Sequence, residues 1–201
     1  MTTTHEPHPV PSKEEIALLA PFDRIGLEQI VLVRTAGQAR EACAALCDSP
    51  VWGFDTESRP TFFKDQVSDG PHIVQLATRH RAWVFQLSDP DCVAQVSALL
   101  ASPRHVKAGF GLGDDTRRIL SKLGVAPAAV LDLNSVFRAR GYRKDIGVKG
   151  AVAVLFNRRF MKSKKAATSN WANQKLTDAQ VLYAANDAYG AARVHDALGL
   201  D

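Results

Sequence analysis

The stretch VWGFDTES, residues 51–58, is an apolar run that ends in two acids. Its first four residues have the composition of a buried strand, and Asp55 and Glu57 follow with Thr56 between them. Because successive side chains of a strand point to opposite faces, Asp55 and Glu57 share one face and Thr56 points to the other. Two like charges side by side repel each other, so the pattern predicts a positively charged group that holds them together.

Apolar runs and helical periodicities alternate along the rest of the chain. Strands are expected over residues 29–35, 51–57, 72–79, 81–88, 105–111 and the start of 129–136, a stretch that then passes into a helix. Helices are expected over 36–50, 91–103 and 114–124, and again from Thr177, which forms a T-x-x-Q capping box with Gln180. A single residue separates the third and fourth strands, which predicts a hairpin. The order predicts an α/β fold with a mixed sheet flanked by helices.

The length of 201 residues and the apolar share of 46% indicate one globular domain. We expect this domain over residues 23–201, after a flexible N-terminal tail over residues 1–22 with a short helix near 14–19. No apolar run approaches the roughly 18 residues of a membrane span, and the N-terminus has no apolar signal core. Three cysteines without a CxxC pattern argue against a disulfide framework or a zinc site, so a cytoplasmic location is expected. Cys43 and Cys47, four residues apart, are predicted to be small core residues.

Positive charge is concentrated in one part of the chain. The net charge is +4, and the segment from Arg138 to Lys175 holds a single acid, Asp145. Its basic residues are Arg138, Arg140, Arg143, Lys144, Lys149, Arg158, Arg159, Lys162, Lys164, Lys165 and Lys175. Such a segment is typical of a surface that binds the phosphates of nucleic acid. The alternative is a solvated surface whose compensating acids lie elsewhere in the fold.

Two further acidic clusters follow the first. Asp114 and Asp115 come after a strand and three closely spaced glycines; we expect Asp114 to cap the next helix, which leaves Asp115 free for function. Tyr183 and Asp187 are four residues apart in the last helix and therefore share a face. Taken singly, the clusters have simpler alternatives, namely a surface pair, a helix cap and a Tyr–Asp hydrogen bond.

Together, the clusters supply four carboxylates from three separate elements: Asp55, Glu57, Asp115 and Asp187. If they converge, their repulsion requires cations, and hard oxygen ligands favour Mg²⁺ or Mn²⁺. Two such ions about 3.5–4 Å apart suit an in-line displacement at phosphorus. Tyr183 would then hold or orient the attacking water, and the basic segment would contact the phosphate backbone.

Three motifs resemble those of the DEDD superfamily of 3′–5′ exonucleases. FDTE (54–57) resembles the first motif, KAGFGLGDDTRRIL (107–120) the second and YAANDAY (183–189) the third. Tyr183 and Asp187 match the Y-x3-D pattern of the tyrosine subclass, which includes ribonuclease D and Werner-type exonucleases. The segment KSKKAATSNW (162–171) is also similar to the segment before the last helix in those two groups. The resemblance implies a ribonuclease H-like fold with a sheet of five to six strands.

The resemblance further implies residue roles and an activity. Asp55, Glu57 and Asp187 would bind one cation and Asp55 and Asp115 a second, with Tyr183 positioning the water. The expected activity is release of 5′-mononucleotides from the 3′ end of single-stranded or frayed DNA or RNA. Substrate contacts are expected from Thr56, Phe62, Phe63, Arg159, Lys162, Lys164, Lys165 and Trp171, of which Trp171 also braces the last helix. Two alternatives remain, a catalytically silent nucleic-acid-binding module on the same fold and a phosphatase for small phosphorylated compounds.

Overall fold

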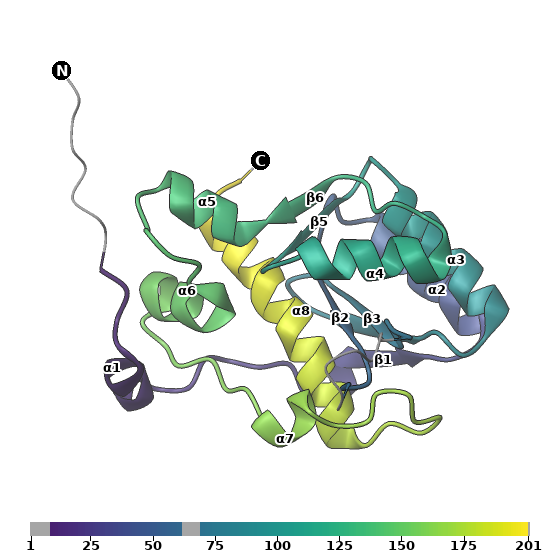
Figure 1. The fold of residues 1–201 in the computed structure, drawn as a ribbon, viewed down its shortest axis with the longest axis horizontal. Helices are drawn as coiled ribbons and strands as arrows, with labels where there is room; N and C mark the ends of the chain where they lie inside the picture. Colours follow the sequence, from purple (N-terminus) through teal and green to yellow (C-terminus); the bar gives the residue numbers. More distant parts are fainter. Residues whose placement is uncertain (1–8, 62–68, 201) are drawn as a thin grey trace.

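The computed structural model describes residues 9–61 and 69–200. Within them six strands form one sheet in the order β1-β4-β3-β2-β5-β6 (Figure 1). The strands are β1 (Ile30–Val33), β2 (Val51–Glu57), β3 (Ile73–Ala77), β4 (Ala82–Gln86), β5 (Val106–Gly109) and β6 (Val130–Asp132). Each lies within a stretch that the sequence predicts to be extended.

The sheet is mixed, as expected. β3 forms antiparallel pairs with β2 and with β4, whereas β1 with β4, β2 with β5 and β5 with β6 are parallel pairs. The β3–β4 hairpin lies on one side of the long strand β2 and β5 lies on the other, so β2 is an interior strand of the sheet. The carboxyl end of β2, where Asp55 and Glu57 lie, is therefore flanked by β3 and continues beyond the pairing with β5, which ends at Gly53.

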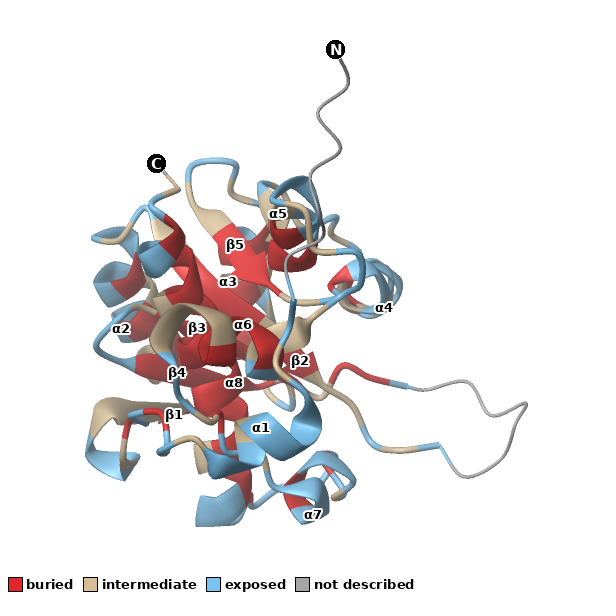
Figure 2. Ribbon diagram, turned by 90° about the vertical axis from the view of Figure 1, so that its left-hand side faces the viewer, coloured by how far each residue is buried: buried red, intermediate tan, exposed pale blue. Residues whose placement is uncertain are grey.

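Helices cover both faces of the sheet. The helical elements are α1 (Lys13–Leu18), η1 (Leu27–Gln29), α2 (Ala36–Cys47), α3 (Pro90–Ala101), α4 (Gly113–Leu123), α5 (Leu133–Ala139), α6 (Gly147–Phe156), α7 (Lys164–Ala167) and α8 (Asp178–Leu198). The core consists of two clusters: one joins the sheet to α2, α3 and α4, the other joins it to α5, α6 and α8. Figure 2 shows buried residues concentrated in the strands and in α8, with α1 and α7 mostly exposed. This is the α/β fold that the sequence predicts.

The long helix α8 crosses the sheet directly over β2, and two local features place it there. Thr177 caps the helix through the predicted capping box with Gln180. Gly53 provides the room, because a Cβ at this position would lie 1.9 Å from the carbonyl oxygen of Ala188 and 2.6 Å from the nitrogen of Ala192. Close contact between the backbones of β2 and α8 brings Asp187 next to Asp55.

Other local expectations are wrong. Leu112, not Asp114, occupies the N-cap of α4, and no side chain caps this helix. Asp114 instead lies exposed on the first turn and pairs with Arg117 one turn further on. Cys47 ends α2 on its exposed side rather than in the core, since the buried face of this helix is formed by Ala39, Ala42 and Leu46. The helix expected after the strand in 129–136 forms as α5, whereas α6 and α7, within the basic segment, are helices that the sequence pattern did not indicate.

The N-terminal segment attaches to the body of the protein near the end of α6. The predicted short helix forms as α1, and the chain then runs alongside Arg159, whose backbone N–H and carbonyl bond to Ala20 and Phe22. Phe22 is buried, with its ring centroid 5.0 Å from that of Phe156. Further on, Asn186 of α8 bonds to both the N–H and the carbonyl of Ile25. Among the described helices none is long and apolar enough to cross a membrane.

Candidate active site

Three carboxylates from two elements meet over the end of β2. Asp55 and Glu57 point toward α8, and Asp187 of α8 points back toward them. One oxygen from each of the three carboxylates lies within 4.8 Å of the others. As the alternation in DTE predicts, Asp55 and Glu57 share one face of the strand. Asp187, which is four residues after Tyr183 in the last helix, is the third acid. We call Asp55, Glu57 and Asp187 the carboxylate cluster.

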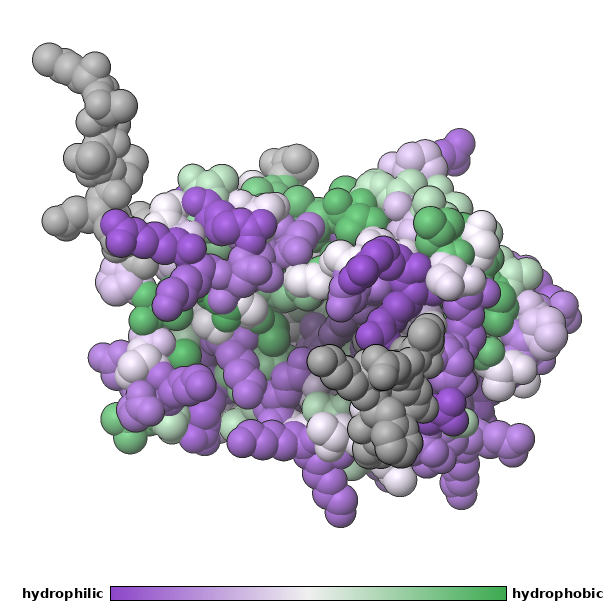
Figure 3. Space-filling view, in the orientation of Figure 1, coloured by the Kyte–Doolittle hydropathy of each residue, from purple (hydrophilic) through white to green (hydrophobic). Residues whose placement is uncertain are grey.

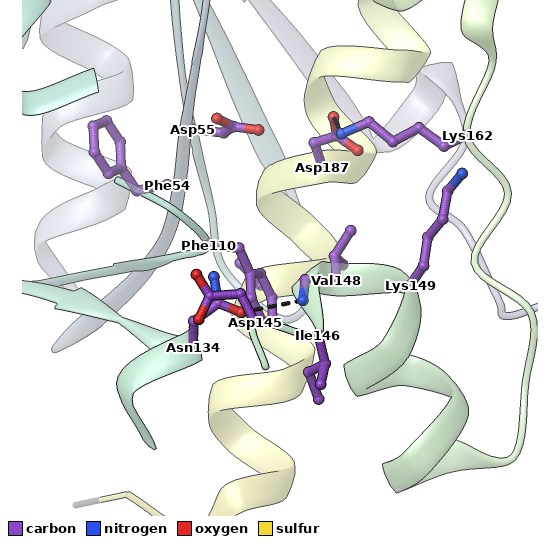
Figure 4. A pocket seen from close by; sticks show the side chains of 12 residues that line it. Phe54, Asp55, Phe110, Asn134, Asp145, Ile146, Val148, Lys149, Lys162 and Asp187 are labelled. Carbon is purple, nitrogen blue, oxygen red and sulfur yellow. Dashed lines mark hydrogen bonds and ion pairs between the residues drawn. The ribbon is translucent and has the colours of Figure 1, made fainter. Parts of the chain in front are cut away.

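A lysine enters the same cluster from the segment between α6 and α7. The Nζ of Lys162 lies 2.6 Å from Oδ2 of Asp187 and 5.1 Å from the ring centroid of Tyr183. In Figure 4 Asp187 lies between Asp55 and Lys162, and the Asp55 carboxylate points toward it. From the sequence, Lys162 is one of several basic residues expected to contact phosphates. In the fold, its ammonium group lies next to the acids of the cluster.

Burial and mutual repulsion change the protonation of these groups. Burial, followed by the nearby charges of Asp187 and Asp115, raises the pKa of Asp55 well above its usual value. The same effects, burial first and then Asp55, raise the pKa of Glu57 to about 9. For Asp187, burial raises the pKa while Lys162 opposes the rise. Burial alone would lower the pKa of Lys162, but the attraction of Asp187 and Asp55 raises it. One lysine cannot balance three ionised carboxylates, so without a further cation Asp55 and Glu57 tend to retain their protons.

Tyr183 lies one turn before Asp187 on the same face of α8. It is buried, and Trp171 packs against it with ring centroids 5.9 Å apart. Trp171 itself is only 1% exposed, so it acts on the site by fixing Tyr183 rather than by stacking on a bound molecule. Burial and the neighbouring Asp187 raise the pKa of Tyr183, which keeps its hydroxyl protonated at neutral pH.

Asp115 approaches β2 from the opposite face. As the alternation predicts, Thr56 points away from the carboxylate cluster, and its hydroxyl donates a hydrogen bond to Oδ1 of Asp115 on the first turn of α4. Asp115 is close enough to affect the pKa of both Asp55 and Glu57, yet its carboxylate is not part of the cluster. The structure thus brings three of the four expected acids together and holds the fourth beside them.

Two hollows flank the end of β2. The first, of about 410 Å³, is lined by Asp55, Asp187, Lys162 and the start of α6 with Lys149. The second, of about 330 Å³, lies on the other side and includes Thr56, Asp115, Arg59 and Arg118. Figure 3 shows mostly hydrophilic side chains on the face that carries α4, α6 and α8. Lys149, Arg59 and Arg118 were not singled out from the sequence, because only the fold shows which cations line a hollow.

The remaining expected substrate contacts lie in different places. Lys164 and Lys165 are exposed on α7. Arg159 is directed to the N-terminal segment, where its Nη1 donates to the carbonyl of Ala17 at 2.6 Å. Phe62 and Phe63 lie outside the described residues.

The residues of the cluster fit a hard divalent cation. They offer only oxygen ligands, which Mg²⁺ and Mn²⁺ prefer, and their ligand atoms already lie close together. The raised pKa of Asp55 shows that the ionised form of this group needs additional positive charge nearby. Lys162 already supplies one positive charge to the cluster through its ion pair with Asp187.

Comparison with known proteins identifies the family. The family profile described as "3′-5′ exonuclease" matches residues 30–201. The chain belongs to this family. The curated relatives include the bifunctional 3′-5′ exonuclease/ATP-dependent helicase WRN of Mus musculus, 28% identical over 156 residues that cover 77% of the chain and 11% of the relative. Another is ribonuclease D of Acidiphilium cryptum (strain JF-5), 29% identical over 175 residues that cover 84% of the chain and 42% of the relative. The chain therefore spans less than half of either relative.

Solved structures share the fold of this chain. The EXO domain of Nibbler from Aedes aegypti superposes with a TM-score of 0.74 at 20% identity, over 89% of the chain and 90% of that domain. Ribonuclease D of Trypanosoma brucei, solved in complex with the RNA U12, gives a TM-score of 0.75 at 22% identity, over 86% of the chain and 63% of that protein. At these identities the likeness concerns the fold, and it confirms the expected ribonuclease H-like sheet flanked by helices.

Proposed function

We propose that this chain is a divalent-cation-dependent 3′–5′ exonuclease of the tyrosine subclass. It would hydrolyse the terminal phosphodiester bond at the 3′ end of a nucleic acid and release a 5′-mononucleotide. The observation that carries the proposal is the convergence of Asp55, Glu57 and Asp187 on one face of β2 in a chain of this family. In the reaction a water oxygen bonds to phosphorus, and the bond from phosphorus to the 3′ oxygen of the preceding nucleotide breaks.

The acids divide between two cation positions in this proposal. Asp55, Glu57 and Asp187 would hold one Mg²⁺ or Mn²⁺, and Asp55 with Asp115 would hold a second. Two such cations would supply an activated water and neutralise the charge that develops on the leaving oxygen. Asp115 accepts a hydrogen bond from Thr56 at Oδ1 and lies near enough to Asp55 to raise its pKa.

Tyr183 is suited to orient the attacking water. Its raised pKa keeps the hydroxyl protonated, so it can donate a hydrogen bond but does not act as a base at neutral pH. Trp171 restrains the ring, and the last helix holds the hydroxyl near Asp187. We infer that Tyr183 fixes the direction of the water and that the carboxylate cluster determines its reactivity.

Charge on the rim of the site supports a nucleic-acid substrate. Lys149 and Lys162 line the hollow beside the cluster, and Lys164 and Lys165 continue the positive charge onto α7. In the proposal these groups contact backbone phosphates of a single-stranded or frayed 3′ end, of DNA or RNA. A cytoplasmic location is part of the proposal, and it is supported by three cysteines that form no disulfide with one another.

One observation favours the alternative of a silent binding module. Lys162 already neutralises part of the charge of Asp187, as a permanent counterion would in a site that binds no metal. Such a module would bind nucleic acid in EDTA and would not shorten it when Mn²⁺ is added.

The test is digestion of 5′-labelled DNA and RNA strands, single and double, with Mg²⁺, Mn²⁺ or EDTA. We expect a cation-dependent ladder that shortens from the 3′ end, with 5′-mononucleotides as products. Asp55→Asn keeps the size of the side chain and removes its charge, and should reduce the rate by about a thousandfold or more, equivalent to about 4 kcal/mol in the barrier.

Asp114→Asn is the matched control, because Asp114 is an exposed acid next to Asp115 that pairs with Arg117 on the surface. It should retain the wild-type rate within about twofold, since surface ion pairs contribute little. Asp55→Asn digesting at the wild-type rate, or a wild type that binds strands without shortening them in Mn²⁺, would contradict the proposed exonuclease.

A further inference from the structure

Gln75 is a buried polar residue without a hydrogen-bonding partner. It lies on β3 with 0% of its surface exposed. Within the part of the chain that the structure describes, neither its Nε2 nor its Oε1 forms a hydrogen bond. A buried carboxamide that lacks partners loses its hydration and gains nothing in return, so it lowers the stability of the fold.

The register of the sheet places Gln75 directly beside the carboxylate cluster. β2 and β3 are antiparallel, and Asp55 is paired with Gln75. The flanking residues Val74 and Leu76 belong to the core under α2, α3 and α4, whereas Ile73 and Ala77 belong to the core under α8. Gln75 alternates with the former pair, so its side chain shares the α8 face with Asp55. Side chains of such a cross-strand pair have Cβ atoms about 4.5–5.5 Å apart, which puts the carboxamide within reach of the Asp55 carboxylate.

A second buried glutamine on the same face of the sheet has a clear structural role and can be compared with Gln75. Gln86 of β4 is opposite Ile73 and is also buried. Its Nε2 donates to the carbonyls of Asn173 at 3.2 Å and Gln174 at 3.3 Å, and so ties the loop before α8 to the sheet. Gln86 therefore stabilises the fold through hydrogen bonds that Gln75 does not make. The position of Gln75 calls for a different explanation.

We propose that Gln75 is a positioning residue of the carboxylate cluster, whose carboxamide donates a hydrogen bond to Asp55 when the cluster binds its divalent cations. Carboxylates that ligate metals are commonly oriented by hydrogen bonds from outer groups, and a charged acceptor makes such a bond stronger. The amide is thus unpaired in the cation-free protein and becomes paired in the loaded protein. This inference rests on the proposed function, because it requires that Asp55 binds a cation.

The experiment measures two quantities on the full chain: the thermal midpoint in EDTA, and the Mn²⁺ affinity by titration calorimetry without nucleic acid. Gln75→Met preserves the length of the side chain and removes its hydrogen-bonding groups. We expect its midpoint in EDTA to equal or exceed that of the wild type, because an unpaired buried amide is removed. Its dissociation constant for Mn²⁺ should rise about tenfold, as for other outer-shell partners. Gln75→Leu is the second variant and should show the same pattern.

Gln86→Met is the matched control. It should lower the midpoint, because two carbonyls lose their donor, and should leave the Mn²⁺ dissociation constant within about twofold of the wild type. The inference is overturned if Gln75→Met binds Mn²⁺ as tightly as the wild type, or if its midpoint in EDTA falls as that of Gln86→Met does. If the inference is overturned in this way but the wild type still shortens oligonucleotides, the proposed exonuclease activity stands. A wild type that binds no Mn²⁺ refutes both proposals.

Discussion

Lys107 and Lys162 are both shielded from water, at opposite ends and on opposite faces of the same sheet. Their surroundings shift their pKa values in opposite directions. Lys107 lies at the start of β5 with 0% of its surface exposed. Its Nζ donates to the carbonyls of Ser102 at 2.6 Å and His105 at 2.8 Å and lies 5.7 Å from the ring centroid of Trp52. Burial lowers the pKa of this lysine to about 8.

At Lys162 the partners are carboxylates instead of carbonyls, and the pKa is raised. Carbonyl dipoles satisfy the hydrogen bonds of an ammonium group without balancing its charge, so at Lys107 the loss of hydration dominates. The acids around Lys162 supply full negative charges that outweigh the same loss. The comparison teaches that Lys107 stabilises a turn, whereas Lys162 belongs to the charge balance of the site.

The largest expected effect concerns Lys107. The folded protein releases the proton of Lys107 near pH 8 and the unfolded chain near 10.5, so the unfolded chain binds more protons between these values and stability rises with pH. Relative to Lys107→Met, the free energy of unfolding of the wild type should increase by up to about 3 kcal/mol from pH 7.5 to 10.5. Urea denaturation at several pH values measures this difference. If the free energy of unfolding changes with pH in the same way for both proteins, Lys107 has the same pKa in the folded and unfolded states. The contrast with Lys162 would then be wrong.

A smaller effect of opposite sign is expected at the carboxylate cluster in EDTA. The pKa of Glu57 is about 9 in the folded protein against an ordinary value of 4.5, so the folded state binds more protons between these values and stability falls as pH rises. Glu57→Gln should therefore raise the free energy of unfolding by about 2 kcal/mol more at pH 6.5 than at pH 5. Urea denaturation in EDTA at both pH values provides the measurement. An equal gain at pH 5 and pH 6.5 would mean that folding does not raise the pKa of Glu57.

The smallest effect concerns Lys162 itself. If its ammonium group balances the charge of Asp187 in the cation-free protein, it competes with a metal ion for the same carboxylate. Lys162→Met should then tighten Mn²⁺ binding about tenfold, or about 1.4 kcal/mol, measured by calorimetry without nucleic acid. Lys164→Met, on exposed α7, removes the same charge from the same segment and should leave the affinity unchanged. Weaker Mn²⁺ binding by Lys162→Met would show that this lysine supports the metal ions instead of competing with them.

Local periodicity was sufficient to predict much of the fold and the central acids. Strand alternation in DTE orients Asp55 and Glu57 together and Thr56 away from them, and helix periodicity aligns Tyr183 with Asp187. The capping box at Thr177 and Gln180 marks the start of α8 at the correct residue. All these features depend on neighbours within about four residues, where backbone geometry determines which side chains share a face.

Features that depend on long-range packing could not be read in the same way. The basic segment gives no reason to single out Lys162 among its lysines and arginines, because only the path of the chain from α6 to α7 brings it to Asp187. Asp114 is a good capping residue, yet after the turn through Gly111 the N-cap falls two residues earlier, at Leu112, so the Asp114 side chain faces solvent. Gln75 did carry a signal, namely one carboxamide within an otherwise apolar strand, but its meaning required the register with Asp55.

The close contact at Gly53 determines how the site can vary. Most active-site distances are set by side chains, and a change in one side chain can be compensated by another. Here the separation between Asp55 and Asp187 depends on two backbones that meet where a side chain is missing, and no substitution elsewhere can restore that space. The geometry of the site therefore depends on a glycine that takes no part in the chemistry.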